Sequence, residues 1–143
     1  MITIHPLLRP ALAVALGAIP GALSRFLVEA YLEPLFPSGL PVPTLIVNVT
    51  GCFLMGAIAP LGFARTFTLH PDLRLLLTTG FLGSYTTFSS YELDQTQLVA
   101  ARNLSGEMLY WLGSTGLGLG ALQLGTGLTL WCLDRWENPN ATP

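Results

Sequence analysis

The stretch Gly80-Phe-Leu-Gly83-Ser-Tyr-Thr86-Thr-Phe88-Ser-Ser-Tyr91 decides how this chain folds. Its glycines precede a run of hydroxyl and β-branched residues, whose side chains compete with helical hydrogen bonding. The apolar segment to which it belongs continues on both sides, from about 75 to 101. The pattern therefore predicts a helix that is broken inside this stretch. The alternative is a simple kink, in which neighbouring hydroxyls satisfy the freed backbone groups.

The composition places this broken helix in a membrane. Of the 143 residues, 51% are hydrophobic and 10% are charged, and the mean hydropathy is +0.58. Ordinary soluble domains carry roughly 25% charged residues. The basic residues are all arginines that stand singly along the chain, so they form no stripe that could follow a nucleic-acid backbone. We expect a membrane protein with the lipid bilayer, and no nucleic acid, as its partner.

Three further apolar segments are long enough to cross a bilayer, because a spanning helix needs roughly 20 apolar residues. We therefore expect an all-α membrane protein with four transmembrane helices, the third broken near mid-membrane. The helices are expected at about 7–31, 44–64, 75–101 and 107–133, in one domain over residues 1–136, with a disordered tail at 137–143. Small-xxx-small pairs in the first and last helix, Gly17 with Gly21 and Gly116 with Gly120, indicate close helix packing.

The loop arginines indicate how the helices are oriented. Arg9, Arg65, Arg74 and Arg135 fall on one side of the predicted bundle, and Arg102 falls on the other. Because cytoplasmic loops retain positive charge, both termini are expected in the cytoplasm. Single charges in short loops make this bias shallow, so it leaves room for copies inserted the other way.

A break at membrane depth has chemical consequences. Freed backbone groups in hydrocarbon must be satisfied by protein, water or an ion, and broken membrane helices commonly mark ion sites. Carbonyl groups that end the first half-helix suit a hard cation, whereas amides that open the second half suit an anion. The stretch 80–91 is therefore a candidate ion site.

Polar residues at helical spacing accompany the break. Thr44 and Asn48 share one face of the second helix, and Tyr110, Ser114 and Gly118 share one face of the fourth. The Asn48 amide could make an interhelical hydrogen bond, or its donors could replace water around an anion. Both interpretations stay open, and the face on the fourth helix could continue the same polar track.

Two further features could serve either structure or anion binding. Phe88 and Tyr91 are three residues apart, and they either pack or turn the positive edges of their rings toward an anion. Arg25 lies near the end of the first helix, where it either attracts anions or pairs with Glu29 four residues on.

Other functional classes fit the sequence less well. Intramembrane hydrolysis needs a nucleophile with a positioned base, but His5 and His70 lie outside the spans, so we expect no enzyme. A small four-helix proton-coupled exporter of the small-multidrug type is the stronger alternative, and it depends on a membrane carboxylate. Glu29 lies near a helix end, and Glu92 and Asp94 follow the break. The charge-free centre therefore favours an ion pathway without proton exchange.

A purely structural helix bundle is a third alternative. It predicts that Asn48 and the hydroxyl groups near the break tolerate apolar replacement. Cys52 and Cys132 both fall in apolar stretches without ligand spacing, so we interpret them as packing residues.

Taken in order, four motifs resemble those of the CrcB/Fluc family of fluoride channels. They are Gly17-Ala-Ile-Pro-Gly21-Ala-Leu-Ser-Arg25, Thr44-Leu-Ile-Val-Asn48-Val-Thr-Gly51, the stretch from Gly80 to Tyr91, and the pair Tyr110 and Ser114. The resemblance covers about residues 13–130. It implies a fluoride-selective channel in the plasma (inner) membrane of a prokaryote, crossing the membrane several times, through which fluoride leaves the cytoplasm passively.

The resemblance also implies an assembly and site residues. Two subunits in opposite orientations would form a dual-topology homodimer with a structural sodium ion at their interface, held by the backbone carbonyls of Gly83 and Thr86. Fluoride would pass residues on all four helices: Arg25, Thr44, Asn48, Phe88, Ser90, Tyr91, Tyr110 and Ser114.

Several positions depart from the family pattern. Tyr91 replaces a second phenylalanine and brings a hydroxyl group among the pore aromatics, and Ser84 replaces a usual glycine. Pro20 and Pro43 are also unusual, and Gly118 offers no side chain to the polar track. The arginine bias fits poorly with insertion in both directions, so a homologous partner subunit of opposite bias is an alternative to the homodimer.

Overall fold

The computed structural model describes residues 8–37, 39–64 and 69–137, and over these residues the chain is helical, without strands. The all-α class is therefore confirmed. Three helical stretches, Leu8–Leu35, Val42–Gly62 and Leu104–Glu137, are long and apolar enough to cross a membrane. They contain helix α1 (Leu8–Leu32) with the short 3-10 helix Glu33–Leu35, helix α2 (Val42–Ile58) with the 3-10 helix Ala59–Gly62, and helix α6 (Leu104–Glu137).

The predicted third span is divided into pieces. Helix α3 (Pro71–Leu75) continues as a π-helix, η3 (Leu76–Leu82), and then as α4 (Gly83–Tyr85). After an interruption, helix α5 (Phe88–Ala100) completes the segment. The interruption falls inside the predicted stretch, while the segment begins earlier than expected because His70 caps its first turn ahead of Pro71. No single piece has the length of a span, so four spanning helices remain a prediction.

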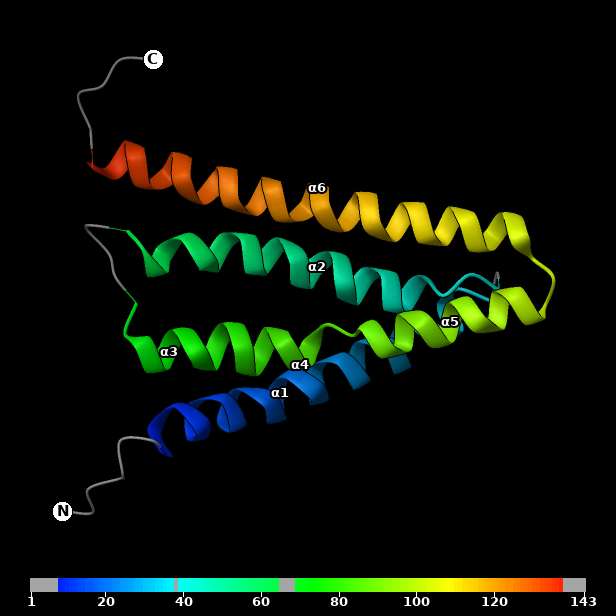
Figure 1. Cartoon of the computed structure of the whole chain (residues 1–143), viewed down its shortest axis with the longest axis horizontal. Helices are drawn as coiled ribbons and strands as arrows, with labels where there is room; N and C mark the ends of the chain where they lie inside the picture. Colours follow the sequence, from blue (N-terminus) through cyan, green and yellow to red (C-terminus); the bar gives the residue numbers. More distant parts are fainter. Residues whose placement is uncertain (1–7, 38, 65–68, 138–143) are drawn as a thin grey trace.

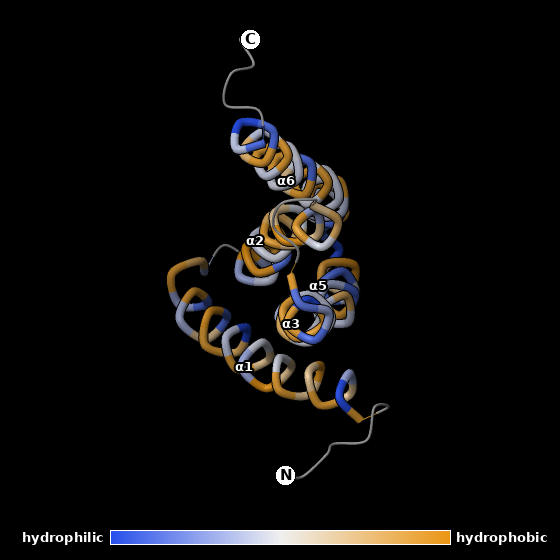
Figure 2. Tube along the Cα trace, turned by 90° about the vertical axis from the view of Figure 1, so that its left-hand side faces the viewer, coloured by the Kyte–Doolittle hydropathy of each residue, from blue (hydrophilic) through white to orange (hydrophobic). Residues whose placement is uncertain are grey.

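The helices pack as two pairs, which Figures 1 and 2 show from the side and from the end. Helix α6 lies along α2, and α1 lies along the broken helix. A Cβ atom on Gly17 would overlap the backbone carbonyl of Leu76, and one on Gly21 would overlap that of Phe81. Glycine at these positions therefore lets the two backbones touch, as the small-xxx-small spacing predicted.

Close approach in the other pair uses different glycines from those the spacing singled out. A Cβ on Gly56 of α2 would overlap the carbonyl of Leu122, and one on Gly125 of α6 would overlap that of Phe53. By contrast, nothing lies within 4 Å of a Cβ placed on Gly116 or Gly120. The predicted glycine pair of α6 thus faces outward in the single chain.

Buried apolar side chains gather on both sides of the interruption. On one side, Val47 and Leu82 are 0% and 1% exposed and pack with Tyr85. On the other, Tyr91 and Tyr110 form a second cluster with Leu98. Most large apolar side chains of α1 and α6 instead point outward, including Leu16, Ile19, Leu23, Leu124 and Leu128. Such an apolar exterior suits lipid and not water.

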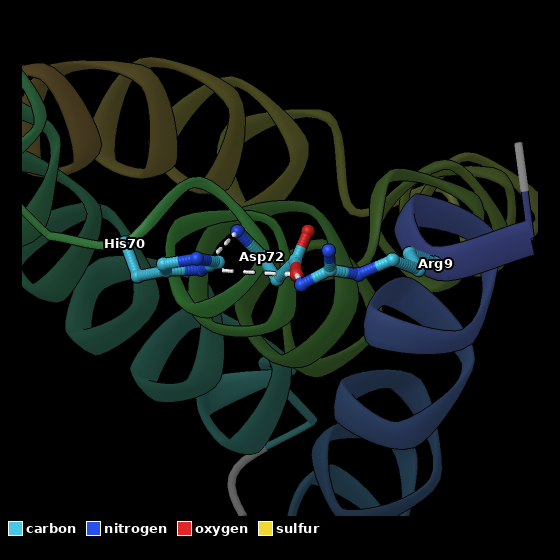
Figure 3. Close-up of polar contacts among 3 residues, drawn as sticks. All are labelled: Arg9, His70 and Asp72. Carbon is cyan, nitrogen blue, oxygen red and sulfur yellow. Dashed lines mark hydrogen bonds and ion pairs between the residues drawn. The ribbon is translucent and has the colours of Figure 1, made fainter. Parts of the chain in front are cut away.

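One end of the bundle gathers the start of α1, the start of α3 and the end of α6 (Figure 1). There Arg9 forms an ion pair with Asp72 at 2.8 Å, and His70 Nδ1 accepts the Asp72 amide proton at 3.3 Å (Figure 3). The pair is 56% and 32% exposed, so it contributes at most about 1 kcal/mol in water. Arg65 and most of the predicted tail lie outside the described residues, and Glu137 is the last residue of α6.

Candidate functional site

Asn48 of α2 holds the interruption of the third segment open. Thr86 and Thr87 have extended ψ angles of 155° and 123° there. The Asn48 side chain bonds to both backbone groups of Thr87. Its Oδ1 accepts from the Thr87 amide at 2.8 Å, and its Nδ2 donates to the Thr87 carbonyl at 2.9 Å, as the backbone of a neighbouring β-strand would. Asn48 therefore makes the interhelical bond that the sequence left open. One of its two amide protons stays available for another acceptor.

The interruption takes helical hydrogen-bond donors away from backbone carbonyl groups at the end of the first half-helix. In a continuous α-helix, the amide of each residue donates to the carbonyl four residues earlier. Thr87 would thus pair with Gly83, but its amide donates to Asn48. Ser90 would pair with Thr86, but its amide donates to the Thr87 hydroxyl at 3.1 Å. The carbonyls of Gly83 and Thr86, which the sequence predicts as cation ligands, therefore both lose their helical donors.

Threonine side chains cap both helix ends that meet at the interruption. The hydroxyl and amide of Thr86 both donate to the Leu82 carbonyl, at 2.9 and 3.0 Å, which closes the first half. The Thr87 hydroxyl caps α5. Thr87 follows the ordinary N-cap pattern, so its role could have been read from the sequence, where we did not single it out.

A cavity of about 500 Å³ lies beside the interruption, between α2, α5 and α6. Four predicted pore residues line it, namely Asn48, Phe88, Tyr91 and Ser114. The Ser114 hydroxyl is buried and has no hydrogen-bond partner within the described part of the chain. Phe88 is 74% exposed in the single chain. The cavity thus combines aromatic side chains with an amide and a hydroxyl that still have protons to donate.

Cys52, which the sequence assigned to packing, also lines this first cavity. Its sulfur lies 3.6 Å from the position that a Cβ on Gly118 would occupy. The thiol therefore fills space beside the one position of the predicted polar track that has no side chain. The sequence carried no signal for this neighbour, because the contact joins residues of two different helices.

A second cavity, of about 760 Å³, contains the other predicted residues of α2 and α5. Thr44 and Ser90 line it, together with the carboxylates of Glu29, Glu33 and Asp94. Six of the predicted pore residues are therefore divided between two cavities. The second cavity has three carboxylates on its lining, and the first has one, that of Glu92. We did not predict this acidic lining, because its residues come from separate helices.

Aromatic rings connect the two cavities. The Phe88 and Tyr91 ring centroids lie 5.8 Å apart, and those of Tyr91 and Tyr110 lie 5.3 Å apart. Tyr91 lines the first cavity, while the Tyr110 hydroxyl donates to Asp94 of the second at 3.1 Å. Tyr91 and Tyr110 are only 8% and 5% exposed. The buried rings of Tyr91 and Tyr110 thus link the first cavity to Asp94 of the second.

Arg25 stands apart from this arrangement. It lines neither cavity. Within the described ranges it also forms no ion pair with Glu29, so the pairing that we considered from the sequence is not found. Its role in attracting anions remains a prediction.

Comparison with known proteins identifies the kind of chain that carries this site. A family model described as CrcB-like protein, Camphor Resistance (CrcB), matches residues 12–126. A protein of Trichormus variabilis is 44% identical over 128 residues, which are 90% of this chain and 93% of its own. A Synechocystis protein is 47% identical over 119 residues, or 83% and 91% of the two chains. Both are named fluoride-specific ion channel FluC.

These matches also decide between enzyme and channel. The relatives are channels by name, and they match this chain along most of its length. The prediction that the chain is not an enzyme is therefore confirmed. The matched residues include the interruption and every residue that lines the first cavity, so this chain belongs to the CrcB-like family.

Proposed function

We propose that this chain forms a fluoride-selective channel, through which fluoride leaves the cytoplasm down its electrochemical gradient. The observation that carries the proposal is the cavity at the helix interruption, which unpaired donors and aromatic side chains line in an apolar chain. The names of the relatives support fluoride as the ion. Passive export would lower cytoplasmic fluoride and its toxicity, and we expect this in the plasma membrane of a prokaryote.

Fluoride is small and holds its water tightly, so the pathway must replace part of that water. The free amide proton of Asn48 and the Ser114 hydroxyl are donors in the first cavity, and Phe88 and Tyr91 could add the positive edges of their rings. None of them carries a full charge. Several weak sites let an ion leave as readily as it enters, which is what conduction requires.

A sodium ion fits the released carbonyls as a structural cofactor. Sodium prefers hard oxygen ligands, and Gly83 and Thr86 each offer a carbonyl whose helical donor is engaged elsewhere. Such an ion would satisfy backbone groups that would otherwise be costly in hydrocarbon. Within the described residues, no cluster of histidine, cysteine or acidic side chains offers another metal site.

The assembly that we propose is a dimer of two chains in inverted orientation. Phe88 is 74% exposed although it lines the cavity, and α6 presents Gly116 and Gly120 to open space. A second copy would cover these surfaces and complete the ligand shell of the sodium ion. A homologous subunit of opposite arginine bias would serve the same purpose.

Fluoride efflux from liposomes that contain the purified protein tests this function. A fluoride electrode records release after valinomycin sets the membrane potential, and chloride release is measured in parallel. We expect rapid fluoride release, little chloride release, and no change when an uncoupler removes the pH gradient. Release that depends on that gradient would instead support the proton-coupled exporter, whose carboxylates the second cavity could supply. Absence of flux from a folded dimer would contradict the proposal.

A further inference from the structure

The Tyr91 hydroxyl is held by one neighbour only. Gln95, one helical turn further along α5, donates from Nε2 to the Tyr91 oxygen at 2.9 Å. No acceptor for the Tyr91 proton occurs among the residues that the structure describes. A phenol can donate and accept at once, so this hydroxyl still has its proton to give.

Gln95 leaves its own oxygen unused. Its Oε1 is buried and has no partner within the described ranges. An amide can donate through nitrogen or accept through oxygen, so Gln95 could hold the Tyr91 hydroxyl in either of two ways. When nitrogen faces Tyr91, the phenol proton must point elsewhere. When oxygen faces Tyr91, the amide captures that proton.

The ring is fixed while the hydroxyl proton is not. Tyr91 is 8% exposed and is packed between the rings of Phe88 and Tyr110, and it lines the first cavity. Tyr110 differs, because its proton is already donated to Asp94. Of these two tyrosines, Tyr91 is therefore the one that can still donate to an anion.

We propose that Gln95 is a positioning residue that turns the Tyr91 hydroxyl proton toward the anion pathway. This inference rests on the proposed fluoride channel and adds a specificity determinant to it. Fluoride accepts short, strong hydrogen bonds, whereas chloride is larger and accepts weaker ones. A directed hydroxyl beside the aromatic edges therefore favours fluoride over chloride, and Gln95 sets that preference without lining the cavity itself.

A double-mutant cycle on fluoride flux tests the proposal. Gln95→Leu should reduce flux at low fluoride concentration and the fluoride-to-chloride ratio by roughly three- to tenfold, which is the range of one hydrogen bond. In a Tyr91→Phe background, the same substitution should have no effect, because no hydroxyl remains to be oriented. Equal losses in both backgrounds, or no loss in either, would overturn the proposal.

Gln95→Glu sharpens the test. A carboxylate only accepts, so it would take the Tyr91 proton away from the pathway, and we expect a larger loss of flux than with Gln95→Leu. This additional loss should also disappear in the Tyr91→Phe background. If it persists there, the negative charge acts directly on the anion, and positioning is not the cause.

A spectroscopic measurement separates this inference from the proposed function. The tyrosine doublet in ultraviolet resonance Raman spectra reports whether a phenol donates or accepts a hydrogen bond. The Tyr91 contribution is the difference between the unchanged protein and Tyr91→Phe. Fluoride, and not chloride, should shift it toward the donor state, and Gln95→Leu should weaken the shift. A channel that conducts without any shift would refute the inference alone, whereas a shift without flux would refute the proposed function alone.

Discussion

Phe88 shows how a single residue can be tested against a matched partner. It is 74% exposed and lines the first cavity, whereas Phe26 of α1 is 65% exposed and lines neither cavity. Phe88→Ile should abolish fluoride flux and leave a folded protein, because it removes the ring edge from the pathway. Phe26→Ile should leave flux unchanged. Efflux from liposomes measures both, and flux retained by Phe88→Ile would show that this ring does not serve the pathway.

Cys52 gives a chemical probe of the same cavity. Its thiol lines the cavity next to Gly118, while Cys132 is exposed elsewhere on α6. In a Cys132→Ser background, a charged methanethiosulfonate reagent should react with Cys52 and block flux, because the added group fills the cavity. A protein that also carries Cys52→Ala should be insensitive to the reagent. Modification without loss of flux, measured by mass spectrometry and efflux, would place the pathway elsewhere.

At the scale of the element, the broken helix depends on its contact with α1. A Cβ on Gly17 would overlap the Leu76 carbonyl, where the π-helix begins. Gly17→Ala should therefore lower stability by about 1–3 kcal/mol, the usual effect of overpacking. Gly127→Ala is the control, since nothing lies within 4 Å of a Cβ there. Thermal unfolding in detergent compares the two variants, and equal melting temperatures would contradict the close contact.

The same segment shows what a sequence can and cannot predict. The interruption at Thr86 and Thr87 was predictable, because hydroxyl and β-branched residues act on the backbone beside them. The π-helix before it was not predicted. It packs against α1 at Leu76 and Phe81, and such contacts with another helix leave no pattern within the segment itself. Helical spacing singled out Thr44 with Asn48 and Tyr110 with Ser114, and other candidates, such as Ser90, came from the family resemblance. Their division between two cavities depends on how separate helices pack, and spacing along one helix does not contain that information.

At the scale of the whole molecule, the carbonyls without helical donors lead us to predict that fluoride flux requires sodium. If Gly83 and Thr86 hold the ion between two subunits, replacing sodium by N-methylglucamine on both sides of the membrane should abolish flux. The physical reason is that a large organic cation does not fit between backbone carbonyls. Electrode recordings of efflux in each salt measure this, and readdition of sodium should restore flux. Flux that is the same in both salts would mean that the interruption needs no bound cation.

Under the proposed assembly, the single chain is one half of an inverted dimer. Most large apolar side chains of its α1 and α6 are exposed. The start of α1 and the end of α6 lie at the same end of the bundle (Figure 1). An inverted partner would bring that end beside the turn between α5 and α6 of the other chain. Cross-linking in native membranes with reagents that report orientation would reveal such pairing.

Asn48 and its two bonds to Thr87 have a consequence for how this protein can change over generations. The same side chain takes the amide donor away from the Gly83 carbonyl and lines the first cavity with one amide proton unpaired. The proposed cation and anion sites therefore both depend on Asn48. Substitution there alters both sites together, so selection cannot adjust either one separately at this position. The side chains of Tyr91 and Gln95 bond to each other and not to Thr87, so we expect variation in ion preference at these neighbours, where the Asn48–Thr87 bonds need not change.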